Sequence, residues 1–147
     1  MSLGAEFSDP QLALMRAFAA AMIPACVERE LPGADDESIF KAIVAAAEKQ
    51  PKIVVAALHQ IEAFSTDFVT LSEDACSRVM GELQAAQESA LSTFATLVVR
   101  CYYLDDRVMD ALGIAPHPPF PTGKTIEQGD WSLLDPVKAK PKIYRPG

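Results

Sequence analysis

The prolines of this chain are unevenly distributed, and their distribution sets the main limit on its fold. Seven of the eleven prolines lie in residues 114–147, whereas the first 113 residues contain only four. Proline lacks the backbone N–H and clashes with the preceding helical turn, so helix interiors exclude it. We therefore predict a helical body over 1–113 and an extended, proline-rich C-terminal strap over 114–147 that carries no helix.

The composition favours helices packed on helices. Half of the residues are hydrophobic, alanine supplies much of that half, and aromatic residues make up only 7% of the chain. Alanine has the highest helix propensity, whereas sheets favour aromatic and β-branched residues. The 147 residues suit a single domain with one core. We expect an all-α bundle of about five or six helices.

Caps and periodic apolar residues indicate where the helices begin. The predicted starts are Ser8 with Gln11, Asp35 or Asp36, Pro51, Thr70 or Ser72, and Asp105 or Asp106. Apolar residues then recur at helical spacing, and 26–35 is typical of a loop. Between the fourth start and residue 104 no turn signal appears. Either one helix spans about 73–104, or it breaks near 87–89 into an antiparallel pair.

The fourth helix has a clear apolar stripe. We expect its buried face to consist of Cys76, Val79, Met80 and Leu83.

The strap contains too many large hydrophobic residues for a linker. They are Phe120, Ile126, Trp131, Leu133, Leu134, Val137, Ile143 and Tyr144. Apolar side chains at this density must pack on something. Two alternatives remain open: the strap folds back over the body, or part of it lies on another protein.

The charge distribution excludes nucleic acid as a partner. Residues 1–113 contain 8 Lys and Arg against 17 Asp and Glu, or −9, and residues 114–147 contain 5 against 3, or +2. Phosphates require a clustered basic face, which this acidic body lacks.

The sequence also bears on membranes and compartment. Apolar stretches are interrupted well short of the ~20 residues of a membrane span, so we expect no transmembrane segment. Residues 1–15 lack Lys and Arg, so neither a secretory nor a twin-arginine signal is visible. We expect a cytoplasmic chain as it stands, or a periplasmic chain if a signal was removed.

The cysteines and histidines give no sign of a metal or cofactor in this chain. Cys26, Cys76 and Cys101 lack zinc or haem spacing, and we expect three reduced core thiols. His59 and Glu62 share a helical face, but a di-iron site needs about four carboxylates and two histidines. A metal-dependent oxidase is therefore the least favoured function.

The densest polar and aromatic cluster lies near residue 105. Its members are Arg100, Tyr102, Tyr103, Asp105 and Arg107. Tyrosine and arginine in such a mixture are typical of interface hot spots, and equally of internal contacts between the last helix and the strap. Asp105, Asp106 and Asp110 fit a helix start better than acid–base catalysis.

Several segments together resemble the gluconate 2-dehydrogenase subunit 3 family. They are Met22-Ile23-Pro24, the run from Tyr102 to Arg107, Ala111-Leu112-Gly113, Pro118-Pro119-Phe120-Pro121, and the run from Gly129 to Pro136. The resemblance covers most of the chain, and its most specific part is the C-terminal third.

The resemblance implies a role rather than a reaction. Family members are small, non-catalytic subunits that bind a large flavin-dependent sugar or alcohol dehydrogenase of the glucose-methanol-choline class and support its folding, stability or export. FAD is then expected in the partner and no cofactor in this chain. A stand-alone helical adaptor or regulator is the alternative. The twin-arginine signal that such subunits often carry is not visible, which leaves the export role open.

The residues expected to contact the partner or to anchor the strap follow from the cluster, the strap and this resemblance. They are Arg100, Tyr102, Tyr103, Asp105, Arg107, Phe120, Trp131, Leu134 and Tyr144.

Overall fold

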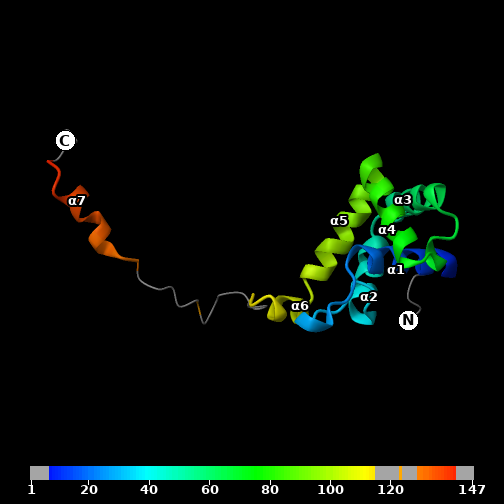
Figure 1. Ribbon diagram of the computed structural model, residues 1–147, viewed down its shortest axis with the longest axis horizontal. Coiled ribbons are helices and arrows are strands. Elements are labelled where there is room, and N and C mark those ends of the chain that lie inside the picture. Colours follow the sequence, from blue (N-terminus) through cyan, green and yellow to red (C-terminus); the bar gives the residue numbers. More distant parts are fainter. Residues whose placement is uncertain (1–6, 115–122, 124–128, 142–147) are drawn as a thin grey trace. The chain divides into compact units, whose positions relative to one another are not determined.

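The computed structural model describes residues 7–114, 123 and 129–141. Within these residues the chain forms seven α-helices and no strand, which confirms the predicted all-α class. The helices are α1 (Asp9–Met22), α2 (Glu37–Ala47), α3 (Pro51–Phe64), α4 (Glu73–Ala86), α5 (Ser89–Tyr103), α6 (Asp106–Ala111) and α7 (Asp135–Lys138) (Figure 1). Three 3₁₀ turns join them, η1 (Val27–Arg29), η2 (Phe68–Thr70) and η3 (Trp131–Leu134). None of the described helices has both the length and the hydropathy needed to cross a membrane.

The chain divides into two compact units, which are described separately. The first unit is Met1–Pro116 and the second is His117–Gly147. The first unit contains α1 to α6, and the second contains η3 and α7.

Side-chain caps explain where the helices of the first unit begin. Before α1, the Ser8 amide donates to Gln11 Oε1 at 2.9 Å. Asp36 Oδ1 accepts from the Ser38 amide at 3.1 Å, and Ser72 Oγ accepts from the Ala75 amide at 3.4 Å. Each bond satisfies a backbone group that the first turn leaves unpaired. The predicted starts at these positions are confirmed.

The chain breaks between α4 and α5 instead of forming one long helix. Gln87 adopts the left-handed conformation, with φ 50° and ψ 35°, which ends α4. The new helix begins two residues later, and Gln60 of α3 supports its first turn, because Gln60 Oε1 accepts from the Leu91 amide at 3.1 Å. A non-glycine residue in this conformation is uncommon, so the sequence carried no turn signal there.

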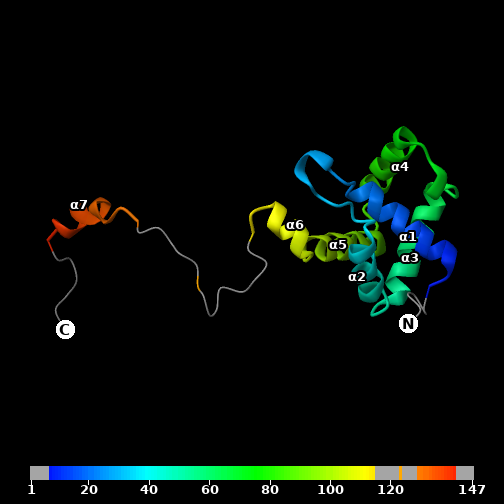
Figure 2. The same ribbon diagram turned by 90° about the horizontal axis from the view of Figure 1, so that it is seen from below.

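The core of the first unit is built around α5. This helix packs against α2 and α3, and α1 lies against α3, α4 and α5, as Figure 1 and Figure 2 show. Phe94 of α5 is completely buried and stacks on Phe18 of α1, with ring centroids 5.5 Å apart. Aromatic pairs at this separation add attraction beyond the area that they bury. The contact therefore holds α1 across α5.

The second unit contradicts one prediction about the strap. Residues 131–138 form η3 and α7, although the strap was expected to carry no helix. Asp130 Oδ1 accepts from the amide and the hydroxyl of Ser132, at 3.0 and 2.6 Å, and begins the turn. Pro136 lies in the first turn of α7, where its missing N–H needs no partner. The extended part of the prediction falls mainly on prolines that lie outside the described residues.

We predict that Phe94→Ala lowers the free energy of unfolding by about 3–5 kcal/mol, since it leaves a cavity beneath α1. Phe64→Ala is the matched control, because Phe64 is 41% exposed and should lose less than about 2 kcal/mol. Urea denaturation followed by circular dichroism measures both values. Equal losses in the two variants would show that Phe94 does not organise the core.

A second prediction concerns the break after α4. Gln87→Gly should raise the free energy of unfolding by up to about 1 kcal/mol, because glycine adopts a positive φ without a steric penalty. Glu82→Gly, in the interior of the same helix, should instead destabilise the protein by about 1 kcal/mol. A loss of stability on Gln87→Gly would mean that the left-handed residue is not strained.

Candidate functional site

Arg107 joins the start of α6 to the start of α2. Its Nη2 donates to Ser38 Oγ at 2.6 Å and to Asp36 Oδ1 at 2.7 Å, and its Nε donates to Asp105 Oδ1 at 3.0 Å. Asp105 also caps α6, because its Oδ1 accepts from the Arg107 amide. Two of the residues expected at an interface, Asp105 and Arg107, are therefore engaged within the chain.

The Arg107 network also changes the ionisation of its carboxylates. Hydrogen bonds from Arg107 hold the pKa of Asp36 and of Asp105 below their usual range. Both carboxylates in turn raise the pKa of Arg107. The Arg107 side chain is 52% exposed, so water screens part of these interactions.

The two neighbouring tyrosines have opposite environments. Tyr102 is buried, and its hydroxyl donates to the Pro32 carbonyl at 3.0 Å, which ties the loop after α1 to α5. Burial raises the pKa of the Tyr102 hydroxyl. Tyr103 packs edge-on against Tyr102 and is 53% exposed. Tyr103 is thus available to a partner, and Tyr102 supports it from beneath.

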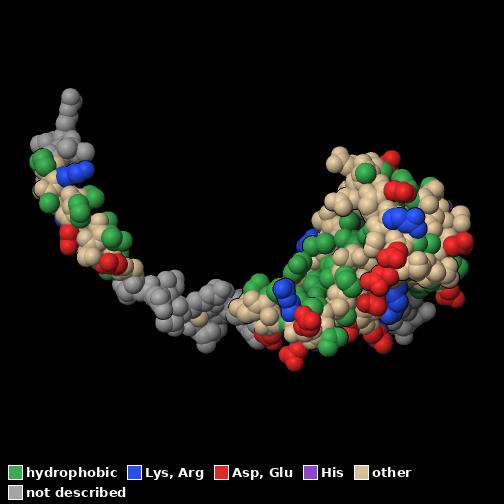
Figure 3. Space-filling model, in the orientation of Figure 1, with side chains coloured by type: hydrophobic (Ala, Val, Ile, Leu, Met, Phe, Trp, Pro, Cys, Tyr) green, Lys and Arg blue, Asp and Glu red, His purple; other side chains and the backbone are tan. Residues whose placement is uncertain are grey.

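Large hydrophobic side chains are exposed where α5 and α6 end. They are Tyr103, Leu104, Leu112 and Ile114. Figure 3 shows hydrophobic side chains gathered on the face of the first unit along α5. Arg100, in the last turn of α5, is exposed as well.

The remaining predicted residues belong to the second unit. Trp131 is 63% exposed and Leu134 is 43% exposed, and Leu133 and Val137 are exposed beside them. Phe120 and Tyr144 lie outside the described residues.

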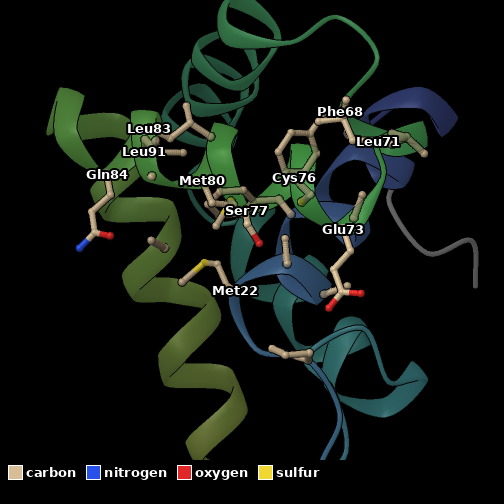
Figure 4. Close-up of a pocket in the computed structure, with 18 of the residues that line it drawn as sticks. Met22, Phe68, Leu71, Glu73, Cys76, Ser77, Met80, Leu83, Gln84 and Leu91 are labelled. Carbon is tan, nitrogen blue, oxygen red and sulfur yellow. The ribbon is translucent and has the colours of Figure 1, made fainter.

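The first unit contains an apolar groove that the sequence did not predict. Its walls are the C-terminal half of α1, the segment from η2 through α4, and the first half of α5. The groove has a volume of about 1320 Å³. Figure 4 shows Met22 and Met80 facing each other from α1 and α4, with Glu73 at one end and Gln84 at the other.

The groove has an apolar floor and few ionisable groups among the described residues that line it. Its floor is formed by buried Phe18, Phe68, Leu83 and Leu91. Glu73 is the one charged residue among the described residues that line it. Burial raises the pKa of the Cys76 thiol, which disfavours the reactive thiolate.

The groove exists because α4 is covered less than its sequence indicates. Of the four residues expected to be buried, only Leu83 is, whereas Cys76, Val79 and Met80 are half-buried. The expectation was wrong for these three because α4 packs mainly on α1 and α3, and the three side chains lie against the core without being enclosed by it. The apolar stripe of α4 was the sequence signal for the groove, because an apolar helix face that the chain does not enclose is available for contact with another element.

The histidine and glutamate considered for a metal site lie at the protein surface. His59 Nδ1 lies 3.3 Å from Glu62 Oε2, and both side chains are largely exposed. Across the described ranges, no group of three His, Cys, Asp or Glu side chains is arranged to hold a metal ion. The three cysteines are free and half-buried, rather than fully within the core as expected.

Comparison with known proteins found no similar protein. No family model matches the chain, and no curated protein or solved structure is significantly similar to it. The resemblance to the gluconate 2-dehydrogenase subunit 3 family therefore stays a prediction from the residue pattern.

We predict that Arg107→Met lowers the free energy of unfolding at neutral pH by on the order of 1 kcal/mol, after allowance for solvent screening. Arg107 lowers the pKa of Asp36 and Asp105, so its contribution is complete above the ordinary carboxyl pKa of about 4 and is lost as the pH falls further. Between about pH 5 and pH 2 the variant should therefore lose less stability than the wild type. Urea titrations at each pH measure this.

The matched control is Arg78→Met, which removes an exposed arginine of α4. Its stability should follow the wild-type pH dependence. If Arg107→Met also followed it, the hydrogen bonds of Arg107 would not set the ionisation of the two carboxylates.

Proposed function

We propose that this chain is a small, non-catalytic subunit that binds and stabilises a larger FAD-dependent dehydrogenase of sugars or alcohols. The observation that carries the proposal is the large apolar groove left open between α1, α4 and α5. The family resemblance supplies the class of the partner, and the groove supplies the reason to expect one.

The first unit has a complete hydrophobic core even though the groove is open. The chain has its own hydrophobic core over α1 to α6, and no buried side-chain nitrogen or oxygen of the described residues lacks a hydrogen-bond partner. Exposed apolar side chains that gather in a concave groove are typical of a binding site. Association with a partner would bury the apolar side chains of the groove.

A second exposed surface supports a permanent partner. Tyr103, Leu104, Leu112 and Ile114 are exposed at the ends of α5 and α6. Permanent interfaces bury more than about 2,000 Å² and are more apolar than transient ones. The groove and this surface together give the first unit apolar area of the kind that such an interface uses.

In this proposal the two subunits have different roles. The partner holds FAD and oxidises the substrate, and the present chain contributes binding surface that stabilises the partner's fold. Assistance with maturation or export would act through the same surfaces.

The complete core also favours a second candidate, a stand-alone helical adaptor. A chain with its own core folds without a permanent partner, and an adaptor would use the groove transiently. The two candidates differ in what is recovered with the chain from its own cells.

We predict that the affinity-tagged chain, purified gently from its source cells, is recovered with a much larger subunit and a flavin absorption spectrum. Native mass and the amount of flavin released on denaturation give the stoichiometry. A parallel purification with the tag alone is the control. A colourless chain recovered alone and well folded would contradict the accessory role and favour the adaptor.

A further inference from the structure

We propose that the groove between α1, α4 and α5 binds a basic amphipathic helix of the partner subunit. This inference rests on the proposed function and specifies the chemistry of the contact. Three observations carry it: the size and helical walls of the groove, the half-buried stripe of α4, and the charge of the segment that forms much of the wall.

The groove is larger than a site for a small molecule, with a volume of about 1320 Å³. Pockets for small molecules usually measure about 300–1,000 Å³. The walls are themselves helices, so an added helix would pack on them by ordinary helix–helix contacts.

The residues of the groove suit close helix packing. Small residues line it at Ala17, Ala21, Gly81 and Ala95, which lets a neighbouring backbone approach. A Cβ placed on Gly81 would meet no atom within 4 Å, so the space above α4 is open there. Met22 and Met80 are flexible and polarisable, and methionine adapts to the side chains of a docked helix. A helix in this space would cover the half-buried stripe of α4.

The charge around the groove selects a basic partner. The segment 67–92, which provides much of its wall, carries one basic residue, Arg78, and five acidic ones, namely Asp67, Glu73, Asp74, Glu82 and Glu88. Glu73 lines the groove itself. A helix with Lys or Arg beside its apolar face would complement this charge.

The same charge disfavours other occupants. A second copy of the chain would bring another acidic surface, since residues 1–113 carry −9. A fatty acid or an anionic lipid would place its negative group beside Glu73. Like charges brought together at an interface oppose association.

Gly81 allows a test that preserves the fold. Gly81→Leu fills the groove from within a helix and replaces the poorest helix former except proline, so the variant should remain folded. We predict that it lowers the recovery of the flavin-containing partner at least about tenfold, whereas Gly81→Ala, the matched control, retains binding. Val27→Glu, at a 90% exposed position away from the groove, should also retain binding.

A photo-crosslinking amino acid at Gln84 identifies the occupant in the assembled complex. The expected product joins Gln84 to a segment of the large subunit with apolar residues at helical spacing and a net positive charge. Cross-links to this chain, to a second copy of it, to a lipid or to an acidic segment would overturn the inference.

A model peptide tests the groove without the partner. An amphipathic helix of about 14 residues, built from Leu and Lys and labelled with a fluorophore, should bind the wild-type chain. Gly81→Leu, or replacement of each peptide Lys by Glu, should weaken binding at least about tenfold. No binding, or binding that Gly81→Leu leaves unchanged, would overturn the inference.

The results separate the two proposals. If the flavoprotein is recovered equally well with Gly81→Leu and with the wild type, the groove inference is wrong and the accessory role stands. If no flavoprotein is recovered with the wild type, the accessory role is wrong, and the peptide titration alone decides whether the groove binds basic helices.

Discussion

The stacked contact between Phe18 and Phe94 organises the first unit. It holds α1 against α5, and the other helices of the first unit pack around these two. α2 and α3 cover one side of α5, and α4 packs against α1 and α3. The space left between α1, α4 and α5 is the groove. The groove therefore arises directly from the arrangement of the core, with buried Phe18 at its floor.

The sequence predicted the helices well because their signals are local. Asp36 and Ser72 act on the turn that follows them, and Pro51 stands where a helix can begin, so the sequence alone is sufficient. The break near residues 87–89 was one of two alternatives that the sequence left open, because Gln87, which adopts the left-handed conformation there, is not a residue type that signals a turn. Pro136 was read as a helix breaker, although in the first turn of a helix it is tolerated.

The candidate site was less accessible from sequence for a different reason. The apolar stripe of α4 shows which of its residues tend to be buried. Whether the chain itself buries them depends on contacts with residues distant in the sequence. Tyr102 and Arg107 show the same limit. Tyrosine and arginine are equally typical of an interface and of an internal contact. Only the hydrogen bonds of Tyr102 to Pro32 and of Arg107 to Asp36 show that both residues make contacts within the chain.

The excess of acidic residues over basic ones in residues 1–113 also bears on how the isolated chain behaves in solution. An open apolar surface tends to associate with copies of itself, and the surrounding carboxylates oppose that by mutual repulsion. This repulsion reaches only about 10 Å at 0.1 M salt and about 3 Å at 1 M. The colloidal stability of the chain is therefore tied to ionic strength, because carboxylate repulsion keeps separate copies of the chain apart only at low salt.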